Sequence, residues 1–72
     1  MSTDESAKLE TLLSYWIEHN REHSQEFREW ANKAKGFGQA EVSNEILAAV
    51  TEMDKASALL YRAWSRLKER EG

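Results

Sequence analysis

Two long stripes of mostly apolar residues run along this chain with the spacing of α-helices. Before residue 36 and again after residue 38, the stripe positions follow one another at alternating steps of four and three residues. The first stripe consists of Leu9, Leu13, Trp16, Asn20, His23, Phe27, Trp30 and Ala34, and the second of Val42, Ile46, Ala49, Met53, Ala56, Leu60, Ala63 and Leu67. Such spacing places side chains on one face of a helix. The pattern therefore predicts one helix over about residues 4–35 and another over about 39–70.

The glycines predict where the chain turns between these helices. Gly36-Phe37-Gly38 is the only place where two glycines lie close together. We expect Gly36 to adopt the left-handed conformation that ends the first helix. Gly38 is then expected to cap the start of the second helix. The sequence thus predicts one helical-hairpin domain over residues 1–72, with its turn at 36–38.

The composition excludes several fold classes and indicates that the hairpin has a partner. The 72 residues include no cysteine, no proline and only three glycines. An all-β domain needs turn residues every ~8–12 positions, and without cysteine there is neither a disulfide nor a thiolate metal site. A lone hairpin of this length also buries little apolar surface. We expect an all-α fold, an antiparallel helical hairpin that forms a homodimeric four-helix bundle. A different protein partner is the alternative.

Charge and the start of the chain bear on location and partners. Arg62, Arg66 and Arg70 form a basic row, but the net charge of −3 argues against nucleic-acid binding. The first six residues are polar and acidic, unlike a basic secretion signal, and no apolar run approaches the ~18 residues of a membrane span. We therefore expect a cytoplasmic protein with no nucleic-acid partner and no membrane association.

Histidines interrupt the first stripe near its middle. His19 and His23 are one helical turn apart at the edge of the stripe, so their rings can converge. A turn centred near Phe37 pairs residues whose numbers add to about 73. That register places Glu52 level with the gap between the two histidines. Two imidazoles and a carboxylate resemble a 2-His-1-carboxylate site. The sequence therefore predicts a site for a divalent transition metal ion (Ni²⁺, Co²⁺ or Zn²⁺) formed by His19, His23 and Glu52.

The same residues also have a purely structural interpretation. A polar layer in an apolar seam can fix helix register and oligomeric state. Three hypotheses therefore stay open. The first is a small metal-binding protein for storage, sensing or delivery. The second is a structural or protein-interaction dimerisation module in which Asn20 and His23 form only a polar packing layer. The third is a small dimer that binds an organic ligand between its helices.

No enzymatic activity is expected from this sequence. The string from His19 to His23 matches the zinc-peptidase pattern H-x-x-E-H. However, helical periodicity directs Glu22 away from the core, and the chain is too short for a peptidase domain with a substrate cleft.

A longer stretch carries a family resemblance. Residues 15–23, Y-W-I-E-H-N-R-E-H, together with Phe27 and Trp30-Ala31, resemble a signature of small uncharacterised bacterial and archaeal helical-hairpin domains. The similarity continues through Gly38, residues 41–42 and Met53, and so covers most of the chain. It implies a link to transition-metal homeostasis. On that basis it singles out His19, Asn20, His23 and Met53.

Overall fold

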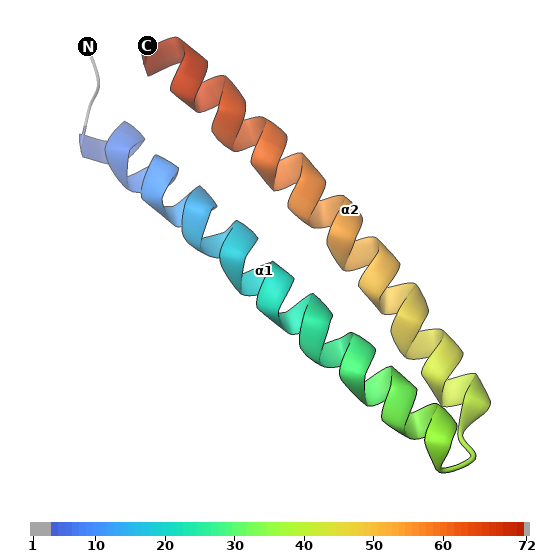
Figure 1. The fold of residues 1–72 in the computed structure, drawn as a ribbon. Coiled ribbons are helices and arrows are strands. Elements are labelled where there is room, and N and C mark those ends of the chain that lie inside the picture. The colour runs from blue at the N-terminus through green and yellow to red at the C-terminus, as the bar shows by residue number, and fades with distance from the viewer. Residues whose placement is uncertain (1–3, 72) are drawn as a thin grey trace.

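The chain folds into two long antiparallel α-helices joined by a short turn (Figure 1). The structure, a computed structural model, describes residues 4–71. Helix α1 covers Asp4–Gly36 and helix α2 covers Ala40–Glu71, and the two pack against each other. No strand occurs among the described residues. The prediction of an all-helical hairpin is therefore confirmed.

The turn differs from the expected one in the roles of its glycines. Gly38 has the left-handed conformation, with φ of 90°, whereas Gly36 is the last residue of α1. The Gln39 N–H donates to the Ala34 carbonyl at 2.8 Å, and the Gln39 carbonyl accepts from the Ser43 N–H at 3.0 Å. The expectation that Gly36 is left-handed and Gly38 caps α2 was thus wrong. Glycine is permissive in both helical senses, so the sequence did not discriminate between the two positions.

Only half of each predicted stripe lines the contact between the helices. The covered positions on α1 include Glu10, Leu13, Ile17, Asn20, Ser24, Ala31 and Ala34, and those on α2 include Ser43, Ile46, Val50, Met53, Ser57, Leu60, Trp64 and Leu67. On α1, Ile17 is covered where Trp16 was predicted, and on α2, Val50 is covered where Ala49 was predicted. The same shift by one residue recurs at every second position of both stripes. Two helices in contact cover only a narrow seam, and the apolar stripes are wider than that seam. The remaining stripe residues therefore lie beside the seam, mostly exposed.

Polar contacts fix the register of the two helices. Ser24, which is buried, donates its hydroxyl to Asp54 Oδ1 at 2.9 Å, and Lys68 Nζ lies 3.1 Å from Glu10 Oε1. In both contacts the residue numbers add to 78 instead of about 73. The turn occupies residues 37–39 instead of 36–38, which accounts for two of these five residues. The whole displacement amounts to about 7.5 Å along α1.

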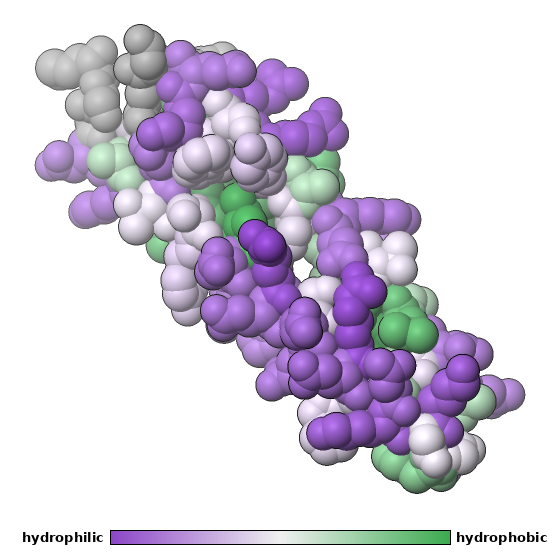
Figure 2. Space-filling model, viewed as in Figure 1, coloured by the Kyte–Doolittle hydropathy of each residue, from purple (hydrophilic) through white to green (hydrophobic). Residues whose placement is uncertain are grey.

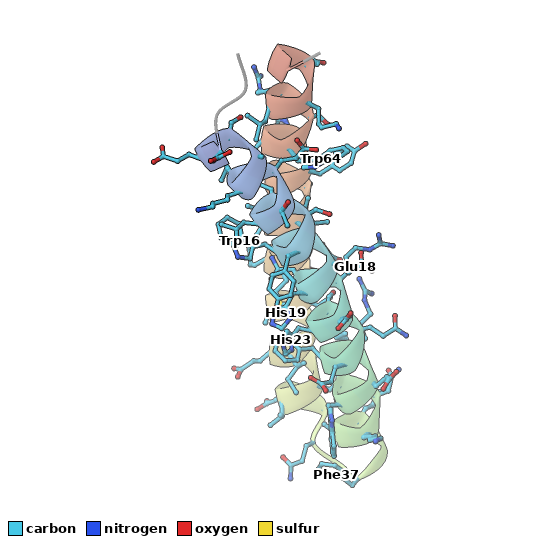
Figure 3. All side chains as sticks on the ribbon, turned by 90° about the vertical axis from the view of Figure 1, so that its left-hand side faces the viewer. Trp16, Glu18, His19, His23, Phe37 and Trp64 are labelled. Carbon is cyan, nitrogen blue, oxygen red and sulfur yellow. The ribbon has the colours of Figure 1, made fainter. Side chains whose placement is uncertain are left out.

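One flank of the seam, here called the polar face, is hydrophilic over most of its area (Figure 2). At its centre Asp54 Oδ2 accepts from Arg28 Nη2 at 2.7 Å, beside the bond from Ser24. Glu18 lies on the same side of α1 and lines a hollow with Trp64 of α2 (Figure 3). These hydrogen bonds and the ion pair join the two helices on this flank.

The opposite flank, here called the apolar face, consists of exposed apolar side chains interrupted by the two histidines and a few charged residues. Its apolar members are Leu9, Leu12, Trp16, Phe27 and Trp30 on α1 and Val42, Ala49, Ala56, Leu59 and Ala63 on α2. Trp16 projects from the side of α1 opposite to Glu18 (Figure 3). Trp30 is 55% exposed. Among the described residues, neither helix has a stretch apolar enough to cross a membrane.

The hairpin leaves most of its apolar surface open. Its radius of gyration is 16.3 Å, against about 11 Å for a compact chain of this length. Its accessible surface of 5752 Å² exceeds by about 1,200 Å² the area of a compact protein of 8.3 kDa. The buried apolar residues are Leu13, Ala31, Ala34 and Val50. Two helices therefore build only part of a core.

Candidate functional site

His19 and His23 meet at one point on the surface of α1. Residues four apart lie above one another on a helix, and here the two Nε2 atoms are 3.0 Å apart. The ring centroids are 4.4 Å apart, with the rings nearly perpendicular. Such a contact requires that one nitrogen carries a hydrogen and the other does not. The convergence expected from the sequence is therefore present.

Neighbouring side chains on α1 hold the two rings in place. Tyr15 stacks on His19 with ring centroids 5.5 Å apart, and Phe27 lies 6.1 Å from His23. Glu26 Oε1 is 3.5 Å from His23 Nδ1. A carboxylate at one ring nitrogen orients the ring and leaves the other nitrogen for a ligand. The arrangement thus directs both Nε2 atoms toward the same space.

The carboxylate near the histidines is Glu26, and not the predicted Glu52. Glu52 Oε1 lies 3.4 Å from Lys55 Nζ, and its side chain is 73% exposed. With the observed register, Glu52 is level with about Glu26, closer to the turn than the histidines. The spacing of His23 and Glu26, three residues apart on one helix, was the sequence signal for this contact. Across residues 4–71, no group of three or more His, Cys, Asp or Glu side chains is arranged to hold a metal ion.

Asn20 and Met53, the other residues indicated by the resemblance, lie in the seam. Both are half-buried, as is His23. They are among the covered positions of the seam, Asn20 between the two histidines along α1 and Met53 on α2. The site therefore combines two exposed nitrogens with a half-buried polar layer.

A hollow of about 520 Å³ adjoins the histidines on the apolar face. Phe27 and Trp30 line it from α1, Ile46 and Ala49 from α2, and Glu26 lies at its edge. Lys33 Nζ lies 4.3 Å from the centroid of the Trp30 ring, a cation–π distance. The hollow is wide open, so it has the form of a contact surface for a large partner instead of a closed ligand cavity.

One domain family matches this chain. It is described as a domain of unknown function, DUF8180, and the match covers residues 9–67. That range contains both histidines, the turn and most of the apolar face. Neither a curated protein nor a solved structure has significant similarity to the chain.

Proposed function

The chain belongs to the DUF8180 family, and on the geometry of its site we propose that it is a non-enzymatic protein that binds a divalent transition metal ion through His19 and His23. The observation that carries this proposal is the distance of 3.0 Å between the two Nε2 atoms. Metal–nitrogen bonds to histidine are about 2.0–2.1 Å long. Two ligands at that length and at bond angles of about 90–109° stand about 2.9–3.3 Å apart. The pair therefore has the spacing needed to hold one ion.

Electrostatics also support a cation at this point. Glu26 Oε1 lies 3.5 Å from His23 Nδ1, and Glu52 of α2, paired with Lys55, lies about level with Glu26. Imidazole nitrogens favour zinc, nickel and related ions. Storage, sensing or delivery of such an ion fits a chain that has no substrate cleft among its described residues. The site is open, so an ion can enter and leave.

A second candidate function follows from the apolar face. A large exposed apolar surface is typical of a protein–protein contact. The hairpin would then be a dimerisation module, and two copies would form an antiparallel four-helix bundle. In this alternative Asn20 and His23 serve only as the polar layer that selects one register. The two functions are compatible, but they differ in their response to loss of the histidines.

Replacing both histidines with alanine tests the metal-binding proposal. For His19→Ala/His23→Ala we expect affinity for Ni²⁺, Co²⁺ and Zn²⁺ to fall by at least about 100-fold, because both nitrogen ligands are lost. Isothermal titration calorimetry of protein without a histidine tag measures this change. The side chains are exposed or half-buried, so the helices should persist in circular dichroism.

Glu18→Ala/Glu22→Ala is the matched control. It removes two charged side chains at the same four-residue spacing from the same part of α1, where both are exposed. We expect its metal affinity to stay within a few-fold of the unaltered chain. An unchanged affinity in the histidine variant would exclude the metal site and leave the dimerisation module as the function.

A further inference from the structure

We propose that the apolar face binds a second copy of this chain, with the two turns at opposite ends and the two-fold axis passing beside His23 and Ala56. In this arrangement the histidines of both copies form one shared metal site. The inference rests on the proposed metal-binding function and specifies which partner completes the site. Four observations support it: the exposed area, the charges on α2, the register of the hairpin and the incomplete set of ligands.

The exposed area matches what a stable dimer buries. The hairpin exposes about 1,200 Å² more than a compact protein of its mass. A stable protein–protein interface buries about 800 Å² on each partner. The apolar face runs the length of a molecule measuring 56 × 15 × 13 Å. A second hairpin of the same length covers such a face from end to end.

The α2 side of the apolar face is self-complementary when two copies run antiparallel. Ala49, Ala56 and Ala63 are exposed and spaced at seven residues, with Ala56 at the centre. If Ala56 meets its own counterpart, Ala49 lies opposite Ala63 of the second copy. In the same register Glu45 lies within one residue of facing Arg66 of the second copy. Small residues therefore face small residues, and a negative charge faces a positive one.

The hairpin register then fixes what happens on α1. Two contacts within the hairpin pair residues whose numbers add to 78, so Ala56 is level with about residue 22 of α1. The axis defined by α2 therefore passes within one residue of His23. With the axis between residues 22 and 23, residues whose numbers add to about 45 face each other, so His19 lies opposite Glu26 of the second copy. His23 then lies within one residue of facing its own counterpart, and Trp16 within one residue of facing Trp30 of the second copy, which covers two exposed aromatic side chains.

The charges disfavour the other symmetric arrangement, in which both turns lie at the same end. In that arrangement α1 of each copy packs on α2 of the other. Residues whose numbers add to 78 would then face each other across the interface, as they do within one hairpin. Glu26 would then face Glu52 of the second copy, a pair of like charges at the interface. In the proposed arrangement the charged residues beside the axis meet opposite charges, histidine or leucine. Like charges brought together at an interface select against that mode of binding.

The second copy supplies what the metal site lacks. One hairpin offers two imidazole nitrogens, and no third ligand is arranged beside them in the part of the chain that the structure describes. Two copies related by an axis beside His23 offer four. Four nitrogen ligands satisfy a tetrahedral ion such as Zn²⁺. The shared site therefore binds one ion for every two chains.

A single cysteine at Ala56 tests the arrangement, because the chain has no cysteine of its own. Packed helices lie about 8–10 Å apart, which brings two Cα atoms facing each other at the axis to about 3.4–5.4 Å. That separation overlaps the range for a disulfide, about 4.4–6.8 Å. We expect Ala56→Cys at low micromolar concentration to form a disulfide-linked dimer in most chains under mild oxidation. Ala58→Cys, exposed on the other flank, should stay mostly unlinked.

Equal cross-linking of the two variants would overturn the proposed arrangement, as would failure of Ala56→Cys to cross-link. Calorimetry with ZnCl₂ on the unaltered chain gives the second readout, with one ion per two chains expected. One ion per chain would overturn the shared site. If His19→Ala/His23→Ala loses Zn²⁺ while Ala56→Cys does not cross-link, the metal-binding function stands and the second copy is excluded. Cross-linking of Ala56→Cys but not Ala58→Cys, with unchanged Zn²⁺ affinity in the histidine variant, would show that the second copy binds at the apolar face and that the histidines do not bind the metal.

Discussion

Ala56→Glu should convert the protein from a dimer into a single hairpin. Ala56 lies at the middle of the apolar face and is exposed in the hairpin, so the substitution leaves the contact between α1 and α2 intact. In the dimer it would place two glutamates next to each other, away from water. Burying an unpaired charge costs several kcal/mol. We expect the dissociation constant of the dimer to rise at least about 1,000-fold, which corresponds to about 4 kcal/mol.

Ala58→Glu provides the matched control for this substitution. Both alanines are exposed on α2 and only two residues apart, but Ala58 lies on the flank away from the apolar face. Sedimentation velocity at several concentrations should show Ala58→Glu associating like the unaltered chain. Equal association of both glutamate variants would show that the apolar face is not the contact surface.

Val50→Asp should unfold the hairpin itself. Val50 is only 2% exposed and is the largest of the nearly completely buried side chains among the described residues. A carboxylate at this position has no partner, and an uncompensated buried charge costs about 3–5 kcal/mol. Since only four apolar side chains are buried in the part of the chain that the structure describes, the hairpin has little stability to lose. We expect the midpoint of thermal unfolding to fall by at least about 12 °C, at about 4–8 °C per kcal/mol.

Ala48→Asp is the control for the buried position. Ala48 is exposed two residues before Val50, so its variant adds the same charge without burying it. Thermal scans followed by circular dichroism at 222 nm should place its midpoint within a few degrees of the unaltered chain. A Val50→Asp variant as stable as this control would contradict the observed seam.

Local spacing in the sequence was sufficient to predict the helices and the pairing of the histidines. Contacts between residues four apart depend only on the helix, which is why His19 and His23 converge as expected. The position of Glu52 depended on the turn. The turn lies one residue later than predicted, Gly38 takes the left-handed conformation, and α2 is displaced by about five residues from the predicted register. Glu26 is on the same helix as the histidines, so its position relative to them does not depend on the register between α1 and α2.

The sequence also predicted the apolar stripes but not which half of each stripe faces the other helix. Trp16 and Ile17 are adjacent in the sequence and both apolar, yet Ile17 is half-buried in the seam and Trp16 is 40% exposed. Ala49 and Val50 differ in the same way. Apolar character alone does not distinguish a contact within the hairpin from a surface beside it. Ser24 and Ser43 could not be predicted as buried, because hydroxyl groups carry no apolar signal.

The mass of the unaltered chain in solution tests the central claim, that the apolar face is covered by a second copy with the histidines at its centre. Sedimentation equilibrium should be measured on untagged protein at about 1–100 μM, with and without Zn²⁺. We predict a mass twice the 8.3 kDa of one chain, with the dimer persisting to lower protein concentration when Zn²⁺ is present. A mass of one chain across the whole range, from protein that is fully helical, would contradict the account.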